Sequence, residues 1–105
     1  MDKKLKLKPE VSICLINFNQ SKFLNQAIDS VINQSYKNFE LIIIDNGSTD
    51  NSKLIIKSYL NDQRIKFLNF DMNDYVTKRL NYSVSIAKGK YCLLYTSPSP
   101  RDGLL

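Results

Sequence analysis

The feature that most constrains this chain is an unbroken aliphatic run at residues 41–44 (LIII), which leads directly into the polar segment 45–50 (DNGSTD). A continuous apolar run without polar alternation is typical of a strand that is buried on both faces. In open α/β sheets, ligands bind beside the carboxyl ends of such strands. The sequence therefore predicts a central strand whose polar end forms one edge of a ligand site.

A strand, a helix and this central strand are expected over the first half of the chain. Residues 11–16 (VSICLI) have the apolar character of a strand. Apolar residues then recur at helical spacing across residues 23–32, which predicts an amphipathic helix with Asn19 or Ser21 as its N-cap. With the central strand beginning at Phe39, these segments form one β-α-β unit.

The second half of the chain continues this alternation. A helix is expected over about residues 52–60, capped by Thr49 or Asp50, and a short strand follows at 65–68. A third helix is expected from about residue 75 to 88, with an apolar face formed by Val76, Leu80, Val84 and Ala87.

The end of this third helix is expected at Gly89, in the left-handed conformation that commonly follows a helix. Tyr91 then opens a fourth strand. Strands that alternate with helices favour a parallel sheet, so the fold class is α/β.

The length of 105 residues suits one small domain or part of a larger one, and the 43% hydrophobic content is enough for a core. The net charge of +5 is partly local, because a basic leader at residues 1–10 holds Lys3, Lys4, Lys6 and Lys8. This leader is expected to be a solvated terminus, with attraction to an anionic membrane surface or to acidic substrates as the alternative. No interleaving of basic and aromatic residues indicates nucleic-acid binding.

The chain contains two cysteines and no histidine. Cys14 lies within an apolar strand pattern, so it is expected to be a buried small hydrophobe. Without histidine there is no Cys-His or Ser-His pair and no metal-ligand spacing, which excludes zinc sites and histidine-dependent triads. No signal peptide and no run of about 18 apolar residues is present, so the chain is expected to be cytoplasmic and not to span a membrane.

Two polar segments are expected to meet at the carboxyl edge of the sheet: residues 17–19 (NFN) and residues 45–48 (DNGS). Their chemistry suits a pyrimidine base, which has donor and acceptor groups and a stacking face. Phe18 offers a ring for stacking, Asn46 can donate and accept hydrogen bonds, and an ionised Asp45 can only accept them.

Gly47 permits a positive φ, which would let the backbone turn sharply and approach a ligand. A structural interpretation of the same segment stays open, in which Asp45 and Asp50 only cap the following turn and helix.

The usual glycine-rich phosphate loops are absent. Only Gly47, Gly89 and Gly103 are available, so neither G-x-G-x-x-G nor G-x-x-x-x-G-K-[ST] can form. This disfavours a dinucleotide Rossmann domain and a P-loop enzyme. A divalent metal would then have to neutralise a bound diphosphate, but the later candidates Asp71 and Asp74 lie in a segment (FDMND) that resembles a loop more than a paired ligand site.

Four motifs, in order over residues 11–91, resemble family-2 glycosyltransferases of the GT-A fold. They read VSICLINFN, AIDSVINQSY, FELIIIDNGSTDNS and TKRLNYSVSIAKGKY. The resemblance implies a partial GT-A, Rossmann-like, mostly parallel sheet with flanking helices, truncated after the third helix. It also implies transfer of a sugar, usually with inversion, from a UDP- or dTDP-linked donor to a glycan, lipid or other acceptor. It further implies cell-envelope polysaccharide biosynthesis in the cytoplasm or at the inner face of the membrane.

The family's cofactor is Mg²⁺ or Mn²⁺, held by an Asp-x-Asp motif, and a later Asp or Glu acts as general base. Several residues depart from the family pattern: Phe18 lacks the usual tyrosine hydroxyl, Asn46 replaces a second aspartate, and Tyr75 stands where glycine is common. Lys78 and Arg79 resemble the basic pair near the donor diphosphate, with a solvated helix face as the alternative. Carried over by motif, the nucleotide-binding residues are Asn17, Phe18, Asn19, Asp45, Asn46, Gly47, Ser48, Lys78 and Arg79.

The chain departs most from the family after Tyr91. Residues 92–102 (CLLYTSPSPRD) stand where a hydrophobic strand and the Asp-x-Asp motif are expected, and they resemble a translated sequencing adapter; a natural Pro/Ser tail is the alternative. The expected organisation is therefore the leader at 1–10, the nucleotide-binding part at 11–91 and a non-native tail at 92–105. Without the metal motif and the general base, the chain alone is expected to be inactive and to hold no metal tightly.

Two alternatives to a glycosyltransferase remain open at this point. One is a non-catalytic α/β binding module, receiver-like or partner-binding, although a receiver would need an acidic pair where Asn17 and Asn19 stand. The other is a fragment that does not fold alone and aggregates through its last strand.

Overall fold

The computed structural model describes residues 9–96, which form four strands and three helices. The predicted alternation of strands and helices is confirmed. In chain order the elements are β1 (Val11–Asn17), α2 (Ser21–Ile32), β2 (Phe39–Asn46), α3 (Ser52–Lys57), β3 (Ile65–Phe70), α4 (Val76–Ile86) and β4 (Tyr91–Thr96).

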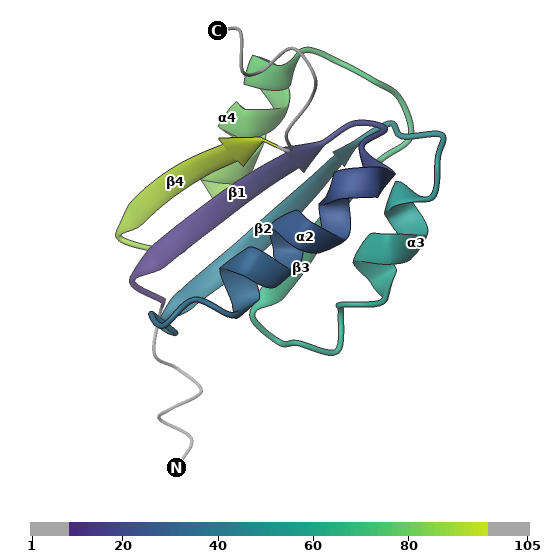
Figure 1. Ribbon diagram of the computed structural model, residues 1–105. Coiled ribbons are helices and arrows are strands. Elements are labelled where there is room, and N and C mark those ends of the chain that lie inside the picture. Colours follow the sequence, from purple (N-terminus) through teal and green to yellow (C-terminus); the bar gives the residue numbers. More distant parts are fainter. Residues whose placement is uncertain (1–8, 97–105) are drawn as a thin grey trace, which may run out of the picture.

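The four strands form one parallel sheet in the order β3-β2-β1-β4. Helices α2 and α3 cover one face of this sheet and α4 lies on the other (Figure 1). The register pairs Asn17 with Asp45 and Asn46 with Phe70. The carboxyl ends of β1, β2 and β3 therefore meet at one edge, as expected for a parallel α/β sheet.

Strand β2 is the centre of the core, because all eight of its residues are buried. Leu41 and Ile43 pack beneath α2 and α3, whereas Ile42 and Ile44 face α4. Full burial of one such side chain contributes about 1.5–3 kcal/mol. The prediction of a strand buried on both faces is confirmed, and so is the burial of Cys14.

The helix N-termini differ from the sequence expectation. Gln20 and Asn51 occupy the N-cap positions of α2 and α3, and neither side chain caps its own helix. Asp50 instead reaches the first residue of α3. Asp50 therefore supports the start of α3 from one residue before its N-cap. The predictions of Asn19, Ser21 and Thr49 as N-caps are wrong, because Ser21 is the first residue of α2 and Asn19 serves a different loop, described below.

Helices α3 and α4 also differ in extent and orientation. α3 ends at Lys57 because the chain tightens into turns with i→i−3 bonds. α4 directs Leu80 and Ser83 toward the sheet and leaves Val76 and Val84 exposed, so its apolar face was only partly predicted. Among residues 9–96, no helix combines the length and apolarity needed to cross a membrane.

Gly89 has a role other than the predicted one. Within residues 9–96 the positive φ angles belong to Asn19 and Gly47, so Gly89 does not end α4 in a left-handed conformation. A Cβ at Gly89 would lie 2.6 Å from the backbone nitrogen of Ser12 and 2.7 Å from the carbonyl carbon of Val11. Glycine is needed because the connection to β4 passes directly against β1.

Strand β4 follows α4 and begins at Tyr91, as predicted. It continues parallel to β1 as far as the pair formed by Ile16 and Thr96, so the sheet extends five residues beyond the expected domain boundary. The adapter origin of residues 92–105 stays a prediction. The prolines of that tail and the lysines of the basic leader lie outside the described residues.

Candidate functional site

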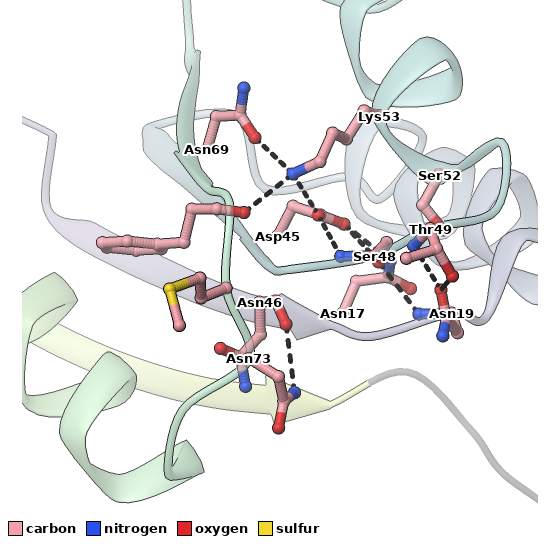
Figure 2. Close-up of polar contacts among 12 residues, drawn as sticks. Asn17, Asn19, Asp45, Asn46, Ser48, Thr49, Ser52, Lys53, Asn69 and Asn73 are labelled. Carbon is pink, nitrogen blue, oxygen red and sulfur yellow. Dashed lines mark hydrogen bonds and ion pairs between the residues drawn. The ribbon is translucent and has the colours of Figure 1, made fainter.

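Three loops meet at the carboxyl edge of the sheet: residues 18–20 after β1, residues 47–51 after β2 and residues 71–75 after β3. Figure 2 shows the polar side chains of these loops and strand ends converging on one another. The two segments predicted to meet, 17–19 and 45–48, are indeed adjacent.

The carboxylate of Asp45 is fully buried at the centre of this edge. One of its oxygens accepts hydrogen bonds from Asn17 Nδ2 at 3.2 Å and Ser48 Oγ at 2.7 Å. The other accepts from the Ser48 backbone N–H at 2.9 Å and from Lys53 Nζ at 2.7 Å. A carboxylate offers about four lone-pair positions, so the protein itself uses all of them. Asp45 therefore holds the residues at this edge together and has no lone pair left for a ligand.

Lys53 was not predicted as part of this site. Its ammonium forms an ion pair with Asp45 and also donates to Asn69 Oδ1 and to the Phe70 carbonyl at 2.9 Å (Figure 2). It thereby ties the end of β3 to the end of β2. The available signal was electrostatic, because a carboxylate at the end of a buried strand requires a nearby cation.

Asn19 links the first loop to the second. Its φ of 51° places it in the left-handed region, which asparagine tolerates better than most residues. Its backbone N–H donates to Ser48 Oγ at 2.9 Å, and its Oδ1 accepts the Thr49 N–H at 2.7 Å. The Asn19 carboxamide oxygen is therefore occupied by the protein.

Gly47 has the predicted positive φ, at 80°. The backbone that approaches it belongs to this chain: a Cβ at Gly47 would lie 2.4 Å from Asn73 N and 2.5 Å from Met72 C. The loop after β3 can cross the end of β2 only because residue 47 has no side chain.

Asn46 forms hydrogen bonds to the loop after β3 that crosses the end of β2. Its Nδ2 donates to the Asp74 carbonyl at 2.9 Å, and its Oδ1 accepts the Asp74 N–H at 3.0 Å. The same Oδ1 accepts from Arg79 Nε at 2.8 Å. Asn73 Nδ2 adds a bond of 3.1 Å to the Asn46 carbonyl, which Figure 2 also shows.

The predicted basic pair divides into two different environments. Lys78 is exposed and pairs with Asp74 at 2.9 Å. The hydrogen bond from Lys78, followed by that from the Tyr75 N–H, holds the pKa of Asp74 below its ordinary value. Arg79 is half-buried, and its guanidinium lies 3.7 Å above the centroid of the Phe70 ring.

Three of the predicted site residues are exposed, namely Phe18, Asn19 and Lys78. The side chains of Asn19 and Lys78 already bond to Thr49 and Asp74, so the ring of Phe18 is the group left open to a ligand. Most of the other predicted residues line the interior of the edge. Five of them are buried: Asn17, Asp45, Asn46, Gly47 and Ser48.

The carboxylates near this edge do not fit a metal ion. Among residues 9–96, no group of three or more Asp, Glu, Cys or His side chains is close enough to hold one. Of the two sequence candidates, Asp71 lies exposed in the loop after β3, and Asp74 is engaged by Lys78. A divalent cation would have to be held by other residues.

A family model for glycosyl transferase family 2 matches residues 12–97. The chain belongs to this family. Glycosyltransferase GlyG of Streptococcus pneumoniae serotype 4 is 31% identical over a segment that covers 83% of this chain and 29% of GlyG. A Haemophilus influenzae glycosyltransferase is 40% identical, covering 79% of this chain and 34% of its own length. This family-2 chain thus spans about a third of the length of these curated relatives.

Two solved structures share its fold. Staphylococcus aureus TarS 1–349 in complex with UDP has a TM-score of 0.74 at 24% identity, and the match covers 87% of this chain and 27% of the TarS 1–349 chain. The mannosyltransferase PcManGT of Pyrobaculum calidifontis, in complex with GDP-Man and Mn²⁺, has a TM-score of 0.68 at 16% identity, covering 77% and 25%. The predicted GT-A sheet is confirmed, and family membership argues against a receiver-like module.

Proposed function

We propose that this chain forms the nucleotide-sugar-binding portion of an inverting glycosyltransferase, with a UDP- or dTDP-linked sugar as donor. The observation that carries the proposal is the meeting of the β1 and β2 ends beside an exposed Phe18, in a chain of glycosyl transferase family 2. The acceptor would be a glycan, a lipid or another hydroxyl-bearing molecule. The UDP and UDP-GlcNAc complexes of TarS support this class of donor.

In this proposal the pyrimidine base stacks on Phe18, because an aromatic ring left half-exposed beside polar strand ends suits the face of a base. Arg79, with Lys78 beside it, would lie toward the diphosphate. Asn17, Asp45, Asn46 and Ser48 would act by holding the loops in shape, since their polar atoms already bond to one another or to neighbouring loops.

Mg²⁺ or Mn²⁺ belongs to the proposed activity of a longer enzyme, in line with the Mn²⁺ complex of PcManGT. When bound, such a metal would stabilise charge on the leaving diphosphate. The sequence has no Asp-x-Asp motif, and the carboxylates near the edge do not fit a metal. We therefore propose that the chain alone has little or no transferase activity.

A role in cell-envelope polysaccharide biosynthesis, in the cytoplasm or peripherally at the inner face of the membrane, is part of the same proposal. The basic leader would favour an anionic surface, because four of its first eight residues are lysines. Binding of the chain to vesicles with and without anionic lipid would test this part separately.

Amide NMR of the ¹⁵N-labelled chain tests the nucleotide proposal. UDP and dTDP, added separately at millimolar concentration, are expected to shift the signals of Phe18 and Arg79 and to leave those of Tyr36, in the segment between α2 and β2, unchanged. If the chain is shown to be folded and no signal from the carboxyl edge shifts, the proposal is contradicted.

A further inference from the structure

The carboxamide of Asn46 both donates and accepts hydrogen bonds. Only 1% of the residue is exposed, and the amide donates to the Asp74 carbonyl while it accepts from the Asp74 N–H and from Arg79 Nε. An aspartate of the same shape could still accept the two N–H bonds. Its second oxygen, however, would face the Asp74 carbonyl with no proton between them. The position therefore favours an amide over a carboxylate.

Arg79 is held in place without an ion pair, although the Asp74 carboxylate lies near enough for the two charges to interact. Its Nη2 donates to the Met72 carbonyl at 2.5 Å, and the Phe70 ring supports one face of the guanidinium. No carboxylate among residues 9–96 lies within ion-pair distance of Arg79, since Asp74 pairs with Lys78 instead. A guanidinium has five N–H donors, and the contacts with Asn46 and Met72 use two of them.

We propose that Asn46 is a positioning residue whose neutral amide orients Arg79 at the carboxyl edge and leaves its charge available for the phosphate groups of a ligand. An aspartate at this position would form an ion pair with Arg79 and compete with an incoming anion. The identity of the anion as a nucleotide diphosphate rests on the proposed function. The positioning of Arg79 does not.

Inorganic pyrophosphate is the probe, because it carries the charge of a diphosphate without a base. The variants are Asn46→Asp, which adds a charge at constant shape, and Asn46→Ala, which removes the hydrogen bonds without adding charge. Asn61→Asp is the matched control, since it adds the same charge on the exposed loop between α3 and β3. Circular dichroism confirms that each variant is folded.

Asn46→Asp is expected to weaken pyrophosphate binding about tenfold or more, the loss that follows removal of one charge-assisted hydrogen bond. Asn61→Asp is expected to change it less than about twofold, because an exposed distant charge is largely screened. Asn46→Ala should fall between the two. In NMR spectra of Asn46→Asp, the Nε–H signal of Arg79 should shift. The affinity of this variant for uncharged uridine should equal that of the wild-type chain.

Equal pyrophosphate affinities in Asn46→Asp and Asn61→Asp would overturn the inference. So would the absence of pyrophosphate binding to the wild-type chain at millimolar concentration. A loss in Asn46→Ala as large as that in Asn46→Asp would also overturn it, since missing hydrogen bonds would then be the cause. Pyrophosphate binding without uridine binding would support the inference and count against the nucleotide proposal.

If Asn46→Asp does not fold, the charge of Arg79 is removed in the neutral background instead. The double variant Asn46→Ala, Arg79→Gln should then bind pyrophosphate about tenfold more weakly than Asn46→Ala alone. Equal binding by these two chains would overturn the inference.

Discussion

Asn19 and Asp50 each hold the loop that contains the other. The Oδ1 of Asn19 accepts the Asp50 N–H at 3.3 Å, and the Asp50 carboxylate accepts the Ser21 N–H at 3.0 Å, just beyond Asn19. The same carboxylate accepts the Ser52 N–H at 2.9 Å. Because Ser21 and Ser52 begin α2 and α3, one aspartate satisfies an orphan donor at the start of each helix. The first two loops are therefore coupled.

This coupling predicts different outcomes for two substitutions of Asn19. Both Asn19→Gly and Asn19→Ala remove the acceptor for Thr49 and Asp50, but only alanine must also adopt the left-handed φ of 51°. The alanine variant should be less stable than the glycine variant by about 1 kcal/mol. Urea unfolding of both chains measures the difference, and an alanine variant as stable as the glycine variant would contradict the assigned backbone conformation.

Lys53 is expected to stabilise the fold by balancing the buried Asp45. Lys53→Met should lower the free energy of unfolding by about 2 kcal/mol, less than for a wholly buried pair because 25% of the Lys53 side chain is exposed. Lys57→Met, on an exposed position of the same helix, should change it by less than about 0.5 kcal/mol. Equal effects in urea unfolding would show that the ion pair contributes nothing specific.

The lowered pKa of Glu40 predicts how the stability of the fold depends on pH. Burial acts to raise the pKa of this carboxyl, but hydrogen bonds from Lys66, the Lys88 N–H and Ser12 outweigh it and hold the pKa below the ordinary 4.5. The stabilisation is therefore present above about pH 4.5 and is lost as the pH falls through the lower pKa of the folded state.

Glu40→Gln should accordingly reduce stability at neutral pH by about 1–3 kcal/mol and flatten the loss of stability on acidification. Urea unfolding at a series of pH values below neutrality measures both effects. Asp71→Asn, which removes an exposed carboxylate, is the control. An acid limb as steep in Glu40→Gln as in the wild-type chain would rule out this role for Glu40.

The sequence predicts the sheet well because its signals are local. The aliphatic run at residues 41–44 requires a buried strand, and the strand ends place Asn17 beside Asp45 once the sheet is parallel. The contacts of Asn19 and Asn46 could not be predicted in the same way. They join segments that lie far apart in the chain; Asn19 and Thr49, for example, are separated by 30 positions.

Residue type alone also does not show whether a polar side chain contacts a ligand or bonds to other parts of the protein. Asp45 and Asn46 have the chemistry of a base-binding pair, but the protein uses their polar atoms for Lys53, Asp74 and Arg79. Only the packed structure distinguishes them from an exposed group such as Phe18. The assignment of these residues to nucleotide binding stays a prediction.

The most direct measurement of the central claim compares UDP binding by two aromatic variants. Phe18 and Tyr36 are 42% and 43% exposed, but only Phe18 lies at the carboxyl edge. If the base stacks on Phe18, Phe18→Ala should raise the Kd for UDP about tenfold, Phe18→Tyr should retain binding, and Tyr36→Ala should bind like the wild-type chain. A Phe18→Ala variant that binds UDP as tightly as Tyr36→Ala would contradict the account.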